Sequence, residues 1–238
     1  MTLPPGECGG LDFSQLTKRA SDEGLAVRGG FHPQSDDLRT LLPHFPSAET
    51  VVLLGFTGSD QWRRFESSRE LLDGLPDPLD RWSRRIIGGL AREFDGRDFY
   101  PTGTPAISFQ RLATRCEPVH SSPIGILIHP RWGLWHAYRG ALVFERRLEL
   151  PPPEAKPSPC VSCASRPCLD ACPVSAFTPH GFDSERCIRH VESEAGVECR
   201  ERGCLARRAC PVAPDAQYLP AQSRFHMAAF LRAAGDRR

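Results

Sequence analysis

Eight of the chain's ten cysteines lie between residues 160 and 211 of a sequence of 238 residues. The first four have the spacing Cys-x2-Cys-x4-Cys-x3-Cys-Pro, and the last is also followed directly by proline. A disulfide framework is typical of short secreted chains, whereas this chain is long and we expect it to carry no signal peptide. The stretch therefore predicts a small module organised by thiolate-bound metal. Its cysteines are Cys160, Cys163, Cys168, Cys172, Cys187, Cys199, Cys204 and Cys210.

The spacing of the first four cysteines is that of a bacterial ferredoxin run with two residues added in the second gap. In such runs three thiolates hold one [4Fe-4S] cluster and the fourth ligates a second cluster. Zinc is the rival interpretation, because Cys160-x2-Cys163 is a common zinc knuckle, but zinc sites do not need a Cys-Pro closure. We assign cluster 1 to Cys160, Cys163, Cys168 and Cys210. We assign cluster 2 to Cys172, Cys187, Cys199 and Cys204, although the spacing around Cys199 is loose and leaves one cluster as the alternative.

Composition limits the other function classes. Hydrophobic residues make up 40% of the chain and charged residues 25%, as in soluble globular proteins. The formal net charge is +1, so we expect neither a nucleic-acid nor a membrane partner. No apolar run is long enough to span a bilayer. Reduced thiols and the expected lack of an export signal predict a cytoplasmic protein. Cys8 and Cys116 stand alone and are expected to be free thiols.

The region before the cysteines alternates between helix-like and strand-like patterns. The apolar run 50–56 is the clearest strand and is predicted to be central in a sheet. Residues 78–94 form the clearest helix, with Asp77 as its cap and Pro78 in its first turn. Such alternation predicts a layered core of helices on a sheet. The expected helices are 14–25, 35–42, 60–72, 78–94 and 221–234, the expected strands are 25–31, 50–56, 124–128 and 141–144, and 95–105 is expected to be a loop.

Proline marks the boundary between two parts of the chain. Residues 151–159 contain five prolines and are typical of a stiff linker. We therefore predict a domain over 1–150, a linker over 151–159, and an iron–sulfur module with a C-terminal helix over 160–238.

The segment 129–140 is rich in side chains that bind cofactors. It holds two histidines, two arginines, two tryptophans and a tyrosine between two predicted strands. Aromatic rings and guanidinium groups suit a large planar anionic cofactor. The alternative is a loop whose tryptophans cap the core and whose arginines are solvated, and His129 and His136 could also be structural rather than axial metal ligands. The cofactor-binding candidates, here and upstream, are Phe109, Gln110, Arg111, His129, Arg131, Trp132, Trp135, Tyr138 and Arg139.

Residues 128–142, together with Phe109-Gln110-Arg111, resemble the vitamin B12 processing enzymes of the CblC type, which are cyanocobalamin decyanases and alkylcobalamin dealkylases. The resemblance covers roughly residues 50 to 145. It implies an α+β fold of the flavin-reductase type, related to nitroreductases, with a sheet and flanking helices. It also implies that this domain binds cobalamin with the lower ligand of the cobalt displaced.

The cysteine module resembles that of epoxyqueuosine reductases and, more distantly, of reductive dehalogenases. The resemblance rests on Cys172-Pro173-Val174-Ser175-Ala176-Phe177, on Cys187-Ile188, and on residues 203–211. It implies a small ferredoxin-like module with two [4Fe-4S] clusters beside a B12-binding domain. The chain departs from the pattern in 203–211, where the middle cysteine is absent, so Cys199 has to replace it. It also ends without the helical repeats of those reductases, which disfavours a tRNA substrate.

These features together predict an iron–sulfur corrinoid reductase or processing protein, in which the clusters deliver electrons to the cobalt of a bound cobalamin. Ferredoxin-type clusters reach about −400 mV, which suits such a step. The electron donor would be ferredoxin or flavodoxin. Two alternatives stay open: a ferredoxin-like electron carrier without an organic cofactor of its own, and an FMN-dependent reductase. We can assign no catalytic residue.

Overall fold

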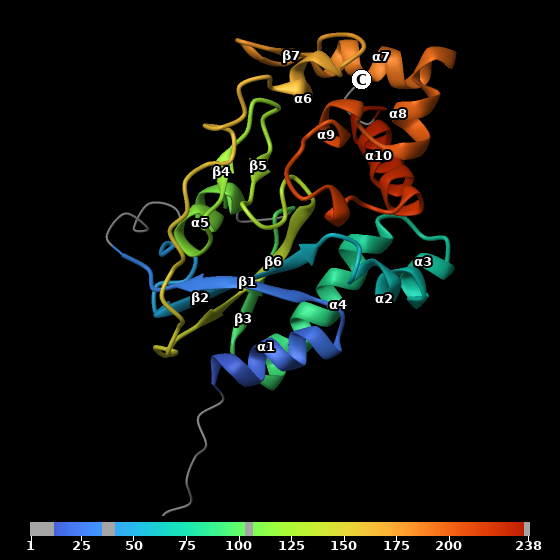
Figure 1. Ribbon diagram of the computed structural model, residues 1–238. Coiled ribbons are helices and arrows are strands. Elements are labelled where there is room, and N and C mark those ends of the chain that lie inside the picture. Colours follow the sequence, from blue (N-terminus) through green and yellow to red (C-terminus); the bar gives the residue numbers. More distant parts are fainter. Residues whose placement is uncertain (1–11, 35–40, 103–106, 236–238) are drawn as a thin grey trace, which may run out of the picture.

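The computed structural model describes residues 12–34, 41–102 and 107–235. The N-terminal part is built on a four-stranded antiparallel sheet with the order β1-β2-β6-β3 (Figure 1). Its inner strands β2 and β6 pair from Thr50 opposite Phe144 to Thr57 opposite His136. The end of β2 and the beginning of β6 therefore meet at one end of the sheet. The four strands are β1 (Ala26–Phe31), β2 (Thr50–Thr57), β3 (Arg97–Phe99) and β6 (His136–Phe144).

Helices cover both faces of this sheet, which is why every residue of β2 is buried. Successive side chains of a strand point to opposite faces. Leu54 and Phe56 pack on one face against α1 (Phe13–Asp22) and α4 (Pro78–Glu93), and Leu53 packs on the other face against α5 (Phe109–Cys116). The continuous apolar run in the sequence thus reflects two cores that share one strand.

The two long N-terminal helices begin in different ways. Asp12 caps α1, because its side chain accepts the N–H of Gln15 while the Gln15 side chain accepts the N–H of Asp12. Asp77 precedes α4 as predicted, but it has left-handed backbone angles (φ 49°, ψ 47°) and its side chain makes no capping bond. The prediction of a side-chain cap at Asp77 is therefore wrong, and Pro78 alone defines the first turn.

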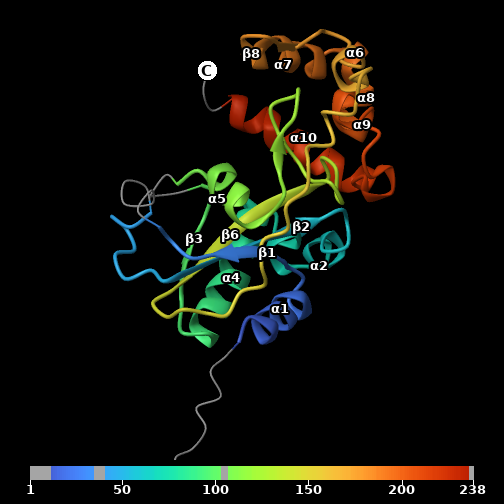
Figure 2. The ribbon, with the colours of Figure 1, turned by 60° about the vertical axis from the view of Figure 1, so that its left-hand side comes forward.

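The cysteine-rich segment forms a layer of short helices above the sheet (Figures 1 and 2). The long helix α10 packs on α8 and returns to the N-terminal part, where the ring of Phe225 lies 5.3 Å from those of Trp62 and Phe65. The elements of this layer are α6 (Pro167–Asp170), β7 (Phe177–Thr178), β8 (Gly181–Phe182), α7 (Ser184–Glu192), a 3-10 turn (Glu194–Gly196), α8 (Val197–Arg202), α9 (Leu205–Arg208), a 3-10 turn (Pro214–Ala216) and α10 (Pro220–Gly235).

The remaining elements correct several sequence predictions. The helix expected over 60–72 is two short helices, because a turn at Ser67 and Ser68 separates them. The loop expected over 95–105 contains the edge strand β3, and β6 begins at His136, so nearly half of the segment 129–140 is strand. The strand expected over 124–128 is only a two-residue pairing. These elements are α2 (Trp62–Glu66), α3 (Arg69–Leu72), β4 (His120–Ser121) and β5 (Leu127–Ile128).

The fold class is confirmed at the level of a mixed α+β protein with a small antiparallel sheet and flanking helices. Residues 151–158 contain no helix or strand. Most of the helix expected over 35–42 falls outside the described residues, as does Cys8. Within the described part of the chain, no helix is both long and apolar enough to cross a bilayer.

Candidate metal centres and the adjoining cleft

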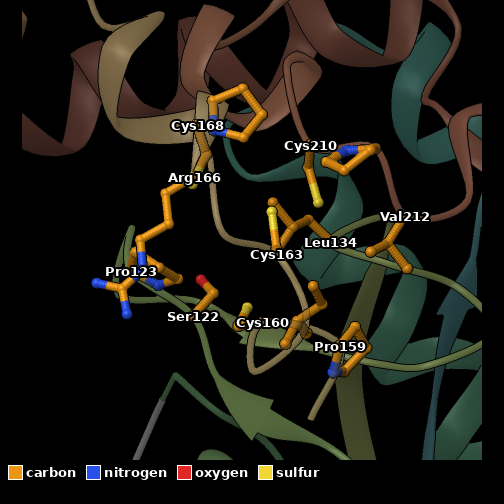
Figure 3. Close-up of a pocket in the computed structure, with 13 residues that line it drawn as sticks. Ser122, Pro123, Leu134, Pro159, Cys160, Cys163, Arg166, Cys168, Cys210 and Val212 are labelled. Atoms are coloured by element: carbon orange, nitrogen blue, oxygen red, sulfur yellow. The ribbon is translucent and has the colours of Figure 1, made fainter.

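The structure places four of the cysteines around one cavity (Figure 3). The sulfur atoms of Cys163 and Cys210 point toward each other in this view. The remaining wall is largely apolar and includes Ile128 and Leu134 from the N-terminal part and Val212 from the module. The cysteines of this first cavity are Cys160, Cys163, Cys168 and Cys210, the set that the sequence assigns to cluster 1.

The other four cysteines surround a second cavity inside the module. It is closed by apolar side chains, among them Val191 and Leu205 from the helices and Met227 from α10. Its cysteines are Cys172, Cys187, Cys199 and Cys204, the set that the sequence assigns to cluster 2. Cys199, the least certain of the eight from its spacing, is buried on α8 and lies on this wall.

Two short helices each bring one cysteine to each cavity. Cys168 lies within α6 and Cys172 follows two residues after that helix ends. Cys204 precedes α9, and Cys210 follows two residues after α9 ends. The two helices pack against each other, so one helix pair positions half of the thiols of both cavities.

The turns that follow the two Cys-Pro steps have the same unusual backbone. Ser175 and Ala213 each lie three residues after a cysteine that precedes proline, and their φ angles are 48° and 53°. A residue other than glycine in this region costs about 1 to 3 kcal/mol, and such strain concentrates at functional sites. In the first turn the N–H of Ala176 donates to the Cys172 sulfur at 3.3 Å. Hydrogen bonds to sulfur are one of the ways in which proteins tune iron–sulfur clusters.

The crowding of thiols disfavours their ionised forms. Burial raises the pKa of Cys168, and the neighbouring Cys210, Cys160 and Cys163 raise it further. Burial and the nearby Cys204 likewise raise the pKa of Cys187 to about 11. Thiolates, not thiols, ligate metals, so metal binding must offset this cost. In the described ranges, no three His, Cys, Asp or Glu side chains are grouped closely enough to hold a single metal ion.

Residues 129–135 fold into a tight turn against the module. His129 and Gly133 exchange backbone hydrogen bonds of 2.8 Å, and the His129 Nδ1 accepts the N–H of Arg131 at 2.9 Å. Gly133 has a φ of 54°, and a Cβ placed there would lie 2.3 Å from the carbonyl oxygen of Val212. Only glycine allows this close approach of the two backbones.

An open cleft of about 480 Å³ lies beside this turn. Arg131 and Trp132 line it, and the Arg131 guanidinium lies 4.5 Å from the centre of the Trp132 ring. Its wall thus combines an aromatic face with cationic, carboxylate and hydroxyl groups. The lining residues are Thr57, Gly58, Ser59, Asp60, Arg63, Arg131, Trp132, Ala213, Asp215, Ala216, Gln217 and Leu219.

The other candidates for cofactor binding lie elsewhere. Phe109 is buried in the core against Phe99, at a ring distance of 5.2 Å, and Gln110 and Arg111 are exposed on α5. Trp135 is buried against the module, where Arg207 lies 4.6 Å above its ring. The sequence therefore predicted one pocket, whereas the structure brings Arg131 and Trp132 alone of the nine to this cleft.

The last two candidates, Tyr138 and Arg139, and the neighbouring His136 are held by partly buried polar contacts. Tyr138 donates to Glu117 at 2.6 Å, while Arg139 forms an ion pair with Asp80 and donates to Ser83 at 3.0 Å. His136 contacts the backbone of β5 through Nε2, at 3.0 Å from the carbonyl oxygen of Leu127.

Sequence reasoning missed the partners of Tyr138. Arg28 is almost fully buried and pairs with Glu117 at 3.0 Å, although 89 residues separate them in the chain. Burial raises the pKa of the Glu117 carboxyl, while Arg28 and Tyr138 oppose that shift. A buried arginine and carboxylate require each other, because removing one leaves an uncompensated charge. No spacing in the sequence indicated this pair.

His136 supplies a test of the buried N-terminal core. Burial, then Arg28, lowers its pKa from 6.5 to about 3 in the folded protein. Below pH 6.5 the unfolded chain binds a proton that the folded chain does not. The contribution of neutral His136 to the free energy of unfolding is therefore complete above pH 6.5 and is lost as pH falls toward 3. We expect His136→Gln to remove about 2 kcal/mol of the stability difference between pH 7 and pH 5, or about 4 to 8 °C in melting temperature.

The matched control for this measurement is His180→Gln, at an exposed position of the module. Melting temperatures of the three proteins should be recorded from pH 5 to pH 8. If melting temperature changed with pH equally in His136→Gln and in the unmodified chain, His136 would not stay neutral in the folded protein.

Comparisons with known proteins found similarity to solved structures only. A scan against protein-family models found no match, and a search of the curated proteins found none either. Among solved structures, epoxyqueuosine reductase from Streptococcus thermophilus is 16% identical with a TM-score of 0.48, over 85% of this chain and 69% of that one. A selenomethionine-labelled epoxyqueuosine reductase is 18% identical with a TM-score of 0.48, over 88% and 70%.

A third neighbour is an epoxyqueuosine reductase solved with a tRNA-Tyr epoxyqueuosine-modified tRNA stem loop. It is 18% identical with a TM-score of 0.44, over 88% of this chain and 69% of that one. The expectation that this chain has no nucleic-acid partner stays a prediction, as do the resemblances to CblC-type enzymes and reductive dehalogenases. All three of these solved structures that resemble the chain are epoxyqueuosine reductases.

Proposed function

We propose that this chain is an iron–sulfur oxidoreductase in which the two sets of four thiols hold two [4Fe-4S] clusters. The donor sets fit, because each cavity offers four cysteines and no other ionisable ligand except His190 at the edge of the second. Four cysteine thiolates are the usual ligands of such a cluster. The apolar remainder of each wall would exclude water, which is one of the factors that set a cluster's reduction potential.

The observation that supports this proposal most strongly is a wall shared by the first cavity and the cleft. In the turn 129–135, Trp132 lines the cleft while Leu134 lines the cavity. In the facing segment, Val212 lines the cavity while Ala213 lines the cleft. The two segments touch at Gly133 and Val212. A group bound in the cleft would therefore lie one layer of side chains from cluster 1.

We infer that the cleft binds cobalamin or a related corrinoid. Bound there, the corrinoid would supply a cobalt that accepts single electrons, and the clusters would supply those electrons at low potential. Trp132 offers apolar contact to a flat ring system, and Arg131 and Arg63 offer cations to its amides and phosphate. Arg131 is held for this role by its stacking on Trp132 and by the bond from its N–H to His129.

Two further parts of the proposal follow from the same arrangement. No residue of the second cavity's wall lines the cleft or adjoins in sequence a residue that does, so cluster 2 would receive electrons first, from a low-potential donor such as ferredoxin or flavodoxin. Residues 1–150 would form the corrinoid-binding domain and residues 160–238 the iron–sulfur module, joined by the linker 151–159.

A cobalamin titration of the reconstituted protein tests the cleft. We expect a shift in the visible spectrum and a higher melting temperature with cobalamin, and Trp132→Ala should weaken binding by about tenfold or more, because aromatic anchors dominate such contacts. Arg111→Ala is the matched control, since Arg111 is exposed on α5 and does not line the cleft.

Other outcomes distinguish the alternatives. Binding of FMN instead of cobalamin would favour a flavoprotein. A protein that carries its clusters but responds to neither compound would contradict the corrinoid proposal and favour an electron carrier.

A further inference from the structure

One seam between α10 and the N-terminal part concentrates unpaired polar groups. Across the described residues, six buried side-chain nitrogen or oxygen atoms lack a hydrogen-bond partner. Buried polar groups are nearly always paired with protein, water or an ion, so each exception requires an explanation. The sixth is His136 Nδ1; the five in the seam are Trp62 Nε1, Trp135 Nε1, the Tyr218 hydroxyl, Gln222 Nε2 and His226 Nε2.

Ring contacts join four of these five residues across the seam. Gln222 and His226 lie four residues apart on α10 and therefore on one side of that helix, and Tyr218 lies two residues before the helix begins. The His226 ring lies 5.6 Å from Tyr218 and 6.1 Å from Trp62. The Tyr218 ring also lies 5.4 Å from that of Trp135. The stripe formed by Tyr218, Gln222 and His226 thus contacts both tryptophans, Trp135 through Tyr218 and Trp62 through His226.

The polarity of the seam is that of a donor site. The Leu219 N–H donates to the Ser59 hydroxyl at 3.0 Å, so Ser59 itself donates to Gln222 Oε1, at 2.6 Å. The Gln222 amide nitrogen therefore remains as a buried donor. The two indole nitrogens can only donate, and a neutral histidine or a tyrosine hydroxyl can donate as well.

The charge of the seam is positive. The Arg207 guanidinium lies 4.6 Å above the Trp135 ring and 4.5 Å above the Tyr218 ring. It donates to the carbonyl oxygen of Leu134 at 3.1 and 2.5 Å, and it forms no ion pair with any residue in the described ranges. Burial lowers the pKa of His226 to about 3, and Arg207 and Arg139 lower it further, so His226 is neutral and the cations act on it without an opposing carboxylate.

We propose that this seam binds one small inorganic anion of halide size, between the stripe Tyr218–Gln222–His226 and the two tryptophans. The anion would accept the unpaired N–H and O–H groups and offset the charge of Arg207. It would thereby fasten α10, and with it the iron–sulfur module, to the N-terminal part. This site goes beyond the proposed function and does not depend on it, because none of the five seam residues lines the two cysteine cavities or the cleft.

The test compares bromide with gluconate at equal ionic strength, on the reconstituted full-length protein in buffer free of other small anions. Gluconate is too large for a buried site between packed rings. We expect the melting temperature to rise saturably with bromide, by about 5 to 10 °C at a hundredfold excess over its dissociation constant. Crystals grown in bromide should show an anomalous scattering peak between Tyr218, His226 and Trp62.

Two variants locate the effect. Gln222→Glu places a carboxylate in the seam and should make the melting temperature independent of bromide. Arg207→Gln should remove the bromide response even if Gln222→Glu does not fold, whereas the matched control Arg189→Gln, at an exposed arginine on α7, should keep it. Equal melting temperatures in bromide and gluconate, or crystals with a water and no anomalous peak at this position, would overturn the proposal.

Discussion

Anaerobically reconstituted protein should contain about eight iron and eight sulfide per chain, because two cubane clusters hold four of each. Removing any one ligand should lower the iron content to about four, since the other cavity keeps its four cysteines. Pairs of substitutions give the sharper result. Cys160→Ala combined with Cys210→Ala should still leave about four iron, whereas Cys160→Ala combined with Cys204→Ala should leave almost none.

Cys116→Ala is the matched control for these variants. Cys116 is the buried last residue of α5; its thiol lies 3.5 Å from the carbonyl oxygen of Leu112, and it lines neither cavity. It should keep about eight iron. The two sets of ligands would be wrongly divided if the double variant at Cys160 and Cys210 lost all its iron while the double variant at Cys160 and Cys204 kept half. A value near four in the unmodified protein, also unchanged by Cys199→Ala, would mean that the second cavity holds no cluster.

Gly133→Ala should be among the most damaging single substitutions outside the cysteines. Its Cβ would lie 2.3 Å from the carbonyl oxygen of Val212, and its φ of 54° is already unfavourable for alanine. The left-handed backbone costs about 1 to 2 kcal/mol, and relieving the contact must separate the two segments that form the shared wall. We expect Gly133→Ala to lower the free energy of unfolding by about 3 kcal/mol or more and to weaken cobalamin binding.

Gly125→Ala separates the two causes. Gly125 also has a positive φ, of 79°, but a Cβ there meets no atom within 4 Å. It should show the conformational cost alone and bind cobalamin like the unmodified protein. Melting temperature and cobalamin affinity should be measured for both variants. Equal melting temperatures and equal cobalamin affinities for Gly133→Ala and Gly125→Ala would show that the contact with Val212 does not shape the cleft.

The cysteine groups could be anticipated from the sequence because ligand order in such modules follows from spacing along the chain. The ferredoxin pattern, in which the fourth cysteine of a run ligates the other cluster, grouped Cys210 with Cys160, Cys163 and Cys168, and the structure brings these four to one cavity. Binding of iron by them stays a prediction. The strand 50–56 and the helix 78–94 were also accessible, because burial on both faces and a 3.6-residue period leave clear patterns.

The cleft could not be delimited in the same way, since membership depends on strand register. β6 begins at His136, so Tyr138 and Arg139 point to opposite faces of the sheet and cannot share one pocket. The antiparallel order of the sheet and the pairing of Arg28 with Glu117 were equally hidden, because both join residues far apart in the chain.

The two sets of thiols are nested within the polypeptide. All four cysteines of the second cavity lie, in sequence, between Cys168 and Cys210, which belong to the first. Closing the inner set shortens the stretch that must still be looped to bring Cys210 back, and a shorter loop costs less entropy to close. Assembly from the inside outward is therefore the easier order. A nascent chain emerging from the ribosome would have to expose Cys210 before the centre nearest the cleft could be completed.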